Sequence, residues 1–246
     1  MKHDLLPANP VTGIKPDYRK SETNDRDSYT PDELQALFTS RIYTGPAKAT
    51  EFWLPLLGLF TGARLNELGQ LAVSDVDVDG PVPSISIEDR SDDPEVVKRL
   101  KNTQSRRVVP IHPKLMELGF GEFVRAAQGT HLFPELPRQA KVGPECTAAF
   151  SKWFGRYLKE VGIKRPRLAA AHSLRHRFVE ACDNCGVNPK VTSALVGHSS
   201  GHAGAGSIMT QRYGGGMKLP MLLDEISKVH FEGFPDSLRK WGKGGP

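Results

Sequence analysis

Arginine, lysine, histidine and tyrosine side chains suited to chemistry on a phosphate occur in five separate segments of the 246-residue chain. In chain order they are Arg64, Lys101, the pair His172 and Arg175, His198, and Tyr213. Guanidinium groups stay charged at any ordinary pH and donate paired hydrogen bonds to phosphate oxygens. A tyrosine can form a covalent phosphotyrosyl link once it loses its proton, although its free pKa is about 10. These residue types indicate phosphoryl transfer, provided that the fold brings them together.

Helical patterns surround the first candidate arginine. Thr30 and Glu33 have the spacing of a capping box, so we expect a helix to begin there. Residues 49–60 are almost entirely apolar but too few to cross a membrane, which predicts a buried central helix. A short helix over residues 64–71 would then carry Arg64 at its start.

Short strands are predicted next along the chain. Turn residues separate three short runs at residues 76–78, 85–87 and 107–109, which indicates a small antiparallel meander. Helical patterns return over residues 113–127, 147–161, 173–182, 189–196 and 219–229. We therefore predict a mainly α fold with a small antiparallel β-sheet, of the α+β class.

The domain organisation follows from periodicity. Residues 1–29 are polar and show none, so we interpret them as a linker or a residual N-terminal segment and exclude them from the core. Residues 30–246 are expected to form one domain. Its amphipathic tail helix, residues 219–229, follows a glycine-rich hinge.

Charge is distributed unevenly along the chain. The net charge of +5 permits a polyanion partner without requiring one. However, residues 96–114 carry six bases and no acid, and residues 152–177 carry eight bases and one acid. The two stretches would form a phosphate-binding face if the fold joins them, and an ordinary solvated surface otherwise. The candidate nucleic-acid contacts within them are Arg106, Arg107, Lys152 and Arg177.

Composition excludes several classes of protein. No apolar run approaches the roughly 18 residues of a membrane span, and the N-terminus lacks the apolar core of an export signal. Three cysteines, at 146, 182 and 185, are too few for a disulfide framework. Cys182 and Cys185 form a lone CxxC pair without two further ligands, so we expect no metal and no other cofactor. The cytoplasm is the expected location.

The order of the candidate segments resembles that of the tyrosine recombinase, or phage integrase, family. The matching segments are Thr61-Gly62-Ala63-Arg64, Ser105-Arg106-Arg107-Val108-Val109-Pro110, His172-Ser173-Leu174-Arg175, Gly197-His198 and Tyr213. The resemblance runs over about residues 30–229 and implies the integrase catalytic-domain fold for residues 30–246. We find no counterpart of the family's separate N-terminal DNA-binding domain. The implied activity is the cleavage and rejoining of DNA strands through a 3′-phosphotyrosyl intermediate, without metal or ATP.

The resemblance gives each candidate a role. Tyr213 is the nucleophile and His172 its general base. Arg64 and Arg175 bind the non-bridging oxygens of the scissile phosphate, to which His198 also donates a hydrogen bond. His172 and Arg175 stand three residues apart, which directs both side chains to one side of a helix.

Two of the roles leave alternatives open. Lys101 would protonate the departing 5′ oxygen as general acid, but Lys98 lies just upstream. The tyrosine follows His198 by 15 residues, farther than is usual in the family, so His202 in the intervening glycine-rich insertion competes with His198. The turn around His198 matches the family better. Glu67 is interpreted as a buried partner that orients a nearby arginine.

Double-stranded DNA is the implied partner. We expect a homotetramer on DNA and a monomer without it. The tail helix would pack either on a neighbouring subunit or on its own subunit. Directionality proteins are possible accessory partners. The implied setting is a bacterial or phage protein associated with the nucleoid. Two other functions stay open, namely a DNA-binding regulator that has lost catalysis and a type IB topoisomerase-like enzyme.

Overall fold

The computed structural model describes residues 27–91, 97–100, 105–137, 146–197 and 218–242. These residues are mainly helical with one three-stranded antiparallel sheet, which confirms the predicted class. The helices are α1 (Pro31–Phe38), α2 (Arg41–Thr44), α3 (Ala49–Thr61), α4 (Leu65–Gly69), α5 (Pro113–Glu117), α6 (Phe120–Ala126), α7 (Ala148–Glu160), α8 (Ala170–Asn184), α9 (Pro189–Val196) and α10 (Leu219–Ile226). The strands are β1 (Val76–Asp77), β2 (Ser84–Ile87) and β3 (Arg107–Pro110), and the 3-10 turn η1 (Val73–Asp75) precedes β1.

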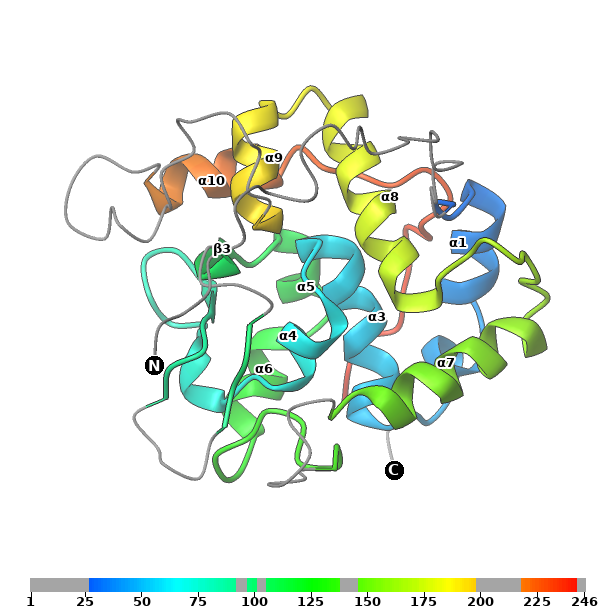
Figure 1. Ribbon diagram of the computed structural model, residues 1–246, viewed down its shortest axis with the longest axis horizontal. Helices are drawn as coiled ribbons and strands as arrows, with labels where there is room; N and C mark the ends of the chain where they lie inside the picture. The colour runs from blue at the N-terminus through cyan, green and yellow to red at the C-terminus, as the bar shows by residue number, and fades with distance from the viewer. Residues whose placement is uncertain (1–26, 92–96, 101–104, 138–145, 198–217, 243–246) are drawn as a thin grey trace, which may run out of the picture.

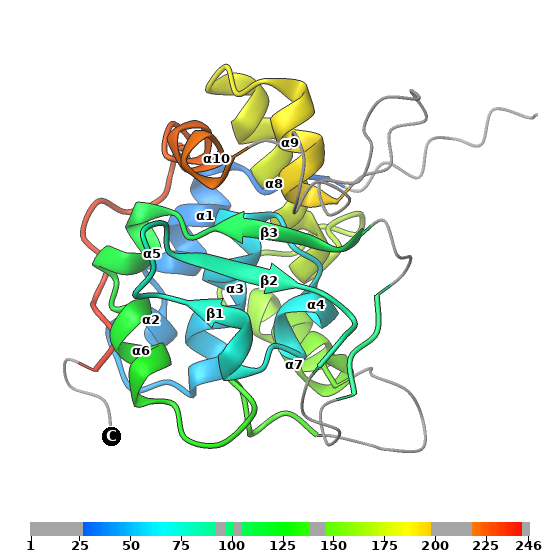
Figure 2. The ribbon, with the colours of Figure 1, turned by 90° about the vertical axis from the view of Figure 1, so that its left-hand side faces the viewer.

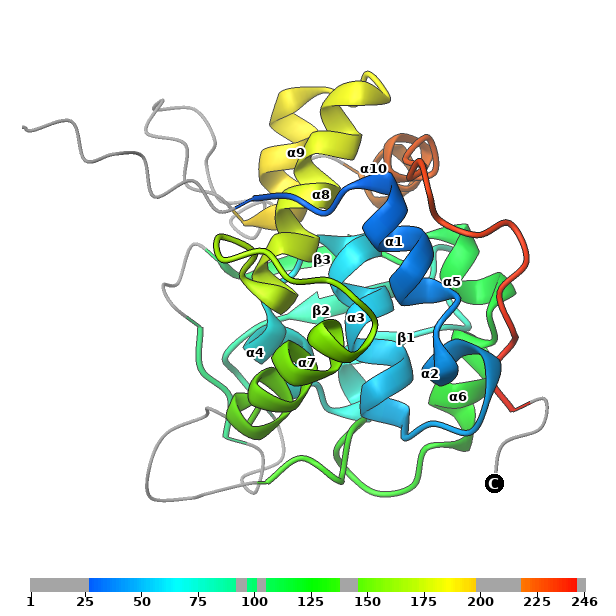
Figure 3. The same cartoon turned by 90° about the vertical axis from the view of Figure 1, so that its right-hand side faces the viewer.

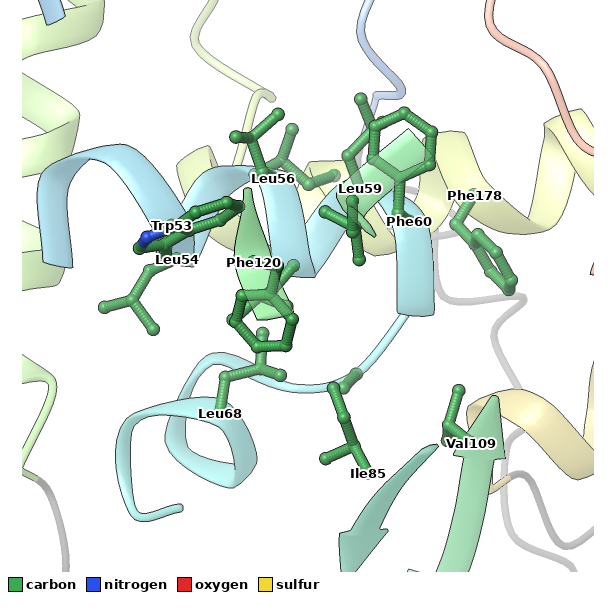
Figure 4. Close-up of a cluster of buried hydrophobic side chains, with 14 of the residues drawn as sticks. Trp53, Leu54, Leu56, Leu59, Phe60, Leu68, Ile85, Val109, Phe120 and Phe178 are labelled. Atoms are coloured by element: carbon green, nitrogen blue, oxygen red, sulfur yellow. The ribbon is translucent and has the colours of Figure 1, made fainter. Parts of the chain in front are cut away.

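Helix α3 lies at the centre of the core (Figure 1). Every residue from Phe52 to Thr61 is buried, as the nearly unbroken apolar sequence predicted. Side chains from α8, the sheet and α6 converge on it, among them Phe178, Ile85 and Phe120 (Figure 4). The core is therefore built around the helix that leads directly to Arg64.

The sheet lies along one side of α3 (Figure 2). In the central strand β2, Ile85 pairs with Val76 of β1 and with Val109 of β3. Helices α9 and α10 pack against β3, the strand at the edge. The end of α9 is thus brought next to the strand that carries Arg107.

The start of the core differs from the expectation. The predicted capping box is present, because the Thr30 hydroxyl accepts the Glu33 N–H and the Glu33 carboxylate accepts the Thr30 N–H. Excluding all of residues 1–29 from the core was wrong for Tyr29, which is buried. Its hydroxyl donates to the carbonyl of Ala170 at 3.0 Å. The chain before α1 therefore supports the beginning of α8.

Arg165 fastens the loop ahead of α8 to the same region. Its Nε and Nη2 donate to the two carboxylate oxygens of Glu33 at 2.8 and 2.9 Å. It also forms an ion pair with Asp27 at 3.3 Å. A paired guanidinium–carboxylate contact fixes direction as well as distance. The loop is consequently oriented before the chain enters α8.

Two predicted helices are shorter than expected. The stretch over residues 113–127 divides into α5 and α6 at Gly119, whose φ of 93° is rare for a residue with a Cβ. The tail helix α10 ends at Ile226, and the chain then descends past α5 and α6 (Figure 3). The Trp241 N–H donates to the carbonyl of Leu118 at 2.9 Å, so this C-terminal segment packs on its own domain.

Candidate active site

A pocket of about 620 Å³ opens between α4, α7 and the beginning of α8. Arg64, His172 and Arg175 all line it, although more than 100 residues separate the first from the other two. Ser151 of α7 and Arg167, in the loop between α7 and α8, complete the polar lining. The fold therefore brings together the three described members of the predicted catalytic set.

Arg64 is positioned by the turn between α3 and α4. Gly62 ends α3 with a φ of 61°, and a Cβ there would lie 2.4 Å from the Phe178 ring. Only glycine fits this close approach without strain. The chain turns sharply, and Arg64 becomes the N-cap of α4 at the rim of the pocket.

Glu67 holds Arg64 in place. Nη1 of Arg64 donates to Glu67 Oε1 at 2.7 Å, and the Arg64 backbone N–H donates to Oε2 at 2.9 Å. Glu67 itself is buried. The interpretation of Glu67 as a buried partner that orients an arginine is confirmed.

Arg175 projects from α8 into the same pocket and is buried. Its Nη1 donates to the carbonyl of Gly62 at 2.5 Å, whereas its buried Nη2 has no hydrogen-bond partner among the described residues. Burial, followed by the like charges of Arg64 and Arg107, lowers the pKa of Arg175 to about 9. A bound anion would supply the missing partner and raise this pKa again, because it favours the charged form.

His172 lies in the first turn of α8, because this helix begins at Ala170 and not at the predicted residue 173. Its ring meets that of His176 edge-on, with centroids 4.8 Å apart. Ala170, at the beginning of the helix, has a φ of 32°, a strained value that the bond from Tyr29 helps to maintain. The entry of α8 is therefore held in a specific conformation beside the pocket.

Arg107 does not lie on the surface, where a residue that contacts nucleic acid would have to be. The side chain is 2% exposed and faces the interior. Its guanidinium donates to Glu67, to the carbonyl of Leu195 and to the carbonyl of Ser105. The sequence contained a signal for this, because alternation along β3 puts Arg107 on the same side as buried Val109. Assigning Arg107 to the DNA surface was wrong.

The other predicted DNA contacts are placed differently from one another. Lys152 is exposed on α7, beside pocket-lining Ser151. Arg106 is partly exposed and pairs with Asp89 at 2.6 Å. Arg177 is 7% exposed, so direct contact between its side chain and DNA is not supported by this arrangement. Lys152 and Arg106 remain available as predicted contacts.

Three predicted catalytic residues, Lys101, His198 and Tyr213, lie outside the described residues, as does His202. The alternative general acid Lys98 is described: it is buried, and its Nζ lies 2.5 Å from a carboxylate oxygen of Asp75. A buried, paired ammonium cannot readily reach a phosphate. This favours Lys101 over Lys98 for that role.

The residues Arg64, Glu67, Arg107 and Arg175, which we call the arginine site, combine three positive formal charges with one negative charge. The described lining of the pocket contains no carboxylate. Within the described part of the chain, no group of three His, Cys, Asp or Glu side chains could hold a metal ion. The electrostatics of the pocket therefore suit an anion such as a phosphate.

Residues 28–213 match the family model for the phage integrase family. The chain belongs to the phage integrase family. The match spans most of the chain and includes the described arginine site as well as Lys101, His198 and Tyr213. No match was found among curated protein sequences. No described helix is both long and apolar enough to span a membrane.

Several solved integrase and recombinase structures share the fold. The Tn1549 transposon integrase bound to transposon right end DNA has a TM-score of 0.57 at 19% identity, with 92% of this chain and 72% of that chain covered. The integrase from mycobacterium phage Brujita has a TM-score of 0.52 at 18% identity, with 84% and 60% covered. The XerH recombinase bound to a palindromic difH substrate has a TM-score of 0.50 at 21% identity, with 71% and 47% covered. The matched region thus spans about half of XerH.

Proposed function

We propose that this integrase-family chain is a site-specific DNA recombinase that cleaves and rejoins DNA through a phosphotyrosyl intermediate on Tyr213. The observation that carries the proposal is the shared pocket of Arg64, His172 and Arg175. Arg175 also keeps a nitrogen, Nη2, that has no partner among the described residues and for which a phosphate oxygen is a suitable acceptor. Family membership and the DNA-bound relatives support the same activity.

In the proposed reaction, His172 removes the proton of Tyr213 and the phenolic oxygen attacks the scissile phosphorus. The bond from phosphorus to the 5′ oxygen breaks, and Lys101 donates a proton to that oxygen. Arg64 and Arg175 bind the non-bridging oxygens, where negative charge grows, and His198 donates a further hydrogen bond. The phosphate remains on the 3′ end as a tyrosyl ester.

Rejoining reverses these steps on a new strand. The 5′ hydroxyl of the incoming strand attacks the phosphotyrosyl phosphorus, Tyr213 leaves, and the phosphodiester forms again. One phosphoester bond is made for each one broken, so no ATP is required. The arginine side chains supply the charge stabilisation for which other phosphoryl-transfer enzymes use metal ions.

Lys152 and Arg106 are the proposed DNA contacts outside the pocket. Lys152 follows Ser151 on α7, so it would reach the backbone next to the bound phosphate. Such contacts position the duplex and weaken with added salt. Exchange between two sites needs four subunits, each supplying one Tyr213, and we propose a homotetramer on DNA that is monomeric without it.

Covalent trapping tests the activity. The probe is a pool of randomised duplexes, nicked so that the short fragment with the new 5′ hydroxyl diffuses away after cleavage. Complexes that survive SDS are sequenced to define a fixed substrate, and the modified residue is mapped. We expect Tyr213→Phe to abolish trapping while DNA affinity is kept, and Tyr157→Phe to trap normally because its hydroxyl instead bonds Ser40.

Other outcomes distinguish the competing functions. DNA binding without any trapping by the wild type would identify a regulator that has lost catalysis. Trapping by Tyr213→Phe would move the nucleophile elsewhere, and loss of cleavage in EDTA would indicate a metal-dependent nuclease. Relaxation of supercoiled plasmid without strand exchange would favour a type IB topoisomerase-like enzyme.

A further inference from the structure

Each of the three guanidinium nitrogens of Arg107 donates a hydrogen bond in the interior of the protein. Its Nε donates to the carbonyl of Leu195 at 2.6 Å, Nη1 to the carbonyl of Ser105 at 2.8 Å, and Nη2 to Glu67 at 2.7 Å. These acceptors belong to α9, to the turn before β3, and to α4. One side chain thus joins three segments that are distant in sequence.

The contacts of Arg107 close a ring that includes Arg64. Glu67 accepts from Arg107 through Oε2 and from Arg64 through Oε1. Buried Ser105 accepts from Arg107 through its carbonyl and from Arg64 through its hydroxyl, the latter at 3.3 Å. Arg64 is therefore held on two sides by groups that Arg107 also holds.

Arg107 also keeps Glu67 ionised. Burial by itself would raise the pKa of this carboxyl, but the charge and hydrogen bond of Arg107, followed by the bonds from Arg64, bring it below its usual value. Without Arg107 the pKa of this carboxyl would rise, because the bonds from Arg64 alone would oppose the effect of burial. Neutral Glu67 would hold the guanidinium of Arg64 less firmly.

The same guanidinium lies under the end of α9. Gly197 terminates this helix with a φ of 65°, and a Cβ there would lie only 2.9 Å from Nη1 of Arg107. The close packing, together with the bond to Leu195, fixes the conformation of the end of this helix. The next residue in the sequence is His198, the proposed donor to the phosphate.

We propose that Arg107 is a positioning residue for DNA cleavage. It holds Glu67 and Ser105 so that Arg64 points into the pocket, and it anchors the end of α9 from which His198 continues. It does not touch the DNA. This inference rests on the proposed function, because it assigns Arg107 a part in the same reaction.

Lysine cannot reproduce this arrangement. An ammonium keeps the charge but lacks the planar fork that reaches three acceptors at once. Loss of alignment by about 1 Å can slow an enzymatic step on the order of a hundredfold. A purely structural role would instead lower the stability and leave the folded fraction fully active.

The test measures single-turnover cleavage of the fixed nicked substrate at saturating DNA, together with the DNA dissociation constant and the melting temperature. For Arg107→Ala and Arg107→Lys we expect cleavage per folded molecule to fall on the order of a hundredfold, with the dissociation constant changed by less than about threefold. Arg125→Ala is the control, because it removes an exposed arginine whose guanidinium pairs with Asp79.

Chemical rescue separates positioning from folding. Guanidinium at low millimolar concentration should restore cleavage by Arg107→Ala by about tenfold or more, while leaving the wild type and the lysine variant unchanged. If the alanine variant does not fold, Gly197→Ala serves instead, because its Cβ would displace Nη1 of Arg107. That variant should also cleave slowly while binding DNA normally.

Three results would overturn the inference. The first is that folded Arg107→Ala cleaves DNA at the wild-type rate. The second is that DNA binding and cleavage are lost to the same extent. The third is that the variant cleaves slowly and guanidinium does not restore its rate. Failure of the proposed function looks different, because the wild type and Arg125→Ala would then also fail to form a covalent complex.

Discussion

The two ends of α3 lie in regions held together by different forces. At its C-terminal end the chain turns into the arginine site, where buried charges are arranged around Glu67. Its N-terminal half packs in an aromatic region that we define as Phe52, Trp53, Phe120, Phe123 and Trp241. Neighbouring ring centroids there lie 4.9 to 6.1 Å apart.

Each region contains a buried donor that has no partner among the described residues. In the aromatic region it is the neutral Nε1 of Trp53, and in the arginine site it is Nη2 of Arg175. An unsatisfied neutral donor costs about 1–3 kcal/mol, and a charged donor costs more. The arginine site therefore retains a destabilising feature that a bound anion would relieve, whereas the aromatic region gains its stability from packing. Substitutions in the two regions should separate activity from stability.

The largest expected effect is that of Arg175→Ala. Loss of a donor aimed at developing charge should reduce cleavage by about a hundredfold to a thousandfold. Stability should change by less than about 1 kcal/mol, because the lost bond to Gly62 is offset by removal of a buried cation near Arg64 and Arg107. Single-turnover cleavage and urea unfolding measure the two quantities. A large loss of stability with normal cleavage would mean that Arg175 serves the fold and not the reaction.

Acid should weaken the packing around His112, whose ring lies against Phe60 outside the aromatic region. His112 Nδ1 accepts the Lys114 N–H, so Nε2 carries the hydrogen and donates to the Val229 carbonyl at 3.0 Å. Burial lowers the pKa of His112 from 6.5 to about 4, which means that the folded state keeps the ring neutral. The folded pKa is below the unfolded value, so this contribution is complete above pH 6.5 and is lost as the pH falls towards 4. The total loss is about 3 kcal/mol at most.

Urea unfolding at a series of pH values measures that loss. His112→Gln is the control, because it does not titrate but still offers a donor to Val229. Its stability should fall less steeply between pH 6.5 and pH 4 than that of the wild type. Identical slopes in the two proteins would show that protonation of His112 does not govern the acid response.

Trp241→Ala should have the smallest of these effects. In contrast to Arg175→Ala, it should lower the stability and leave cleavage unchanged. Its ring contacts Phe52, Trp53 and Phe123 but is only partly buried, so we expect a loss of about 2 kcal/mol, below the usual range for a core tryptophan. Cleavage per folded molecule should stay at the wild-type rate. Thermal unfolding and covalent trapping on the same samples test this. Slower cleavage at full folding would mean that the C-terminal segment acts on the site.

Local sequence signals predicted the elements well and the orientation of side chains less well. The capping box of Thr30 and Glu33 and the apolar run of α3 are short-range features, and the structure contains both. The break at Gly119 was missed because apolar periodicity continues through it. Tyr29 was missed because its partner Ala170 is 141 residues away.

Arg107 shows where inference from the sequence stopped. Two adjacent arginines precede Val108, and the alternation along β3 indicates only that Arg107 shares a side with buried Val109. Arg106 stays partly exposed beside Asp89, whereas Arg107 turns inward to Glu67. What the sequence could not show is the acceptor, a carboxylate 40 residues away that can be reached only after α4 and β3 have packed.

The sequence alone predicted the kind of chemistry that we propose, because residue types and their order along the chain require no coordinates. It also determined the class of the fold, because caps, turns and apolar periodicity act over a few residues. Only the tertiary structure decided which charged groups line the pocket and which pair with one another. Burial and pairing of charges depend on segments brought together from distant parts of the chain. This separates Arg175, which keeps one nitrogen without a partner among the described residues, from Arg107, each of whose three nitrogens donates a hydrogen bond.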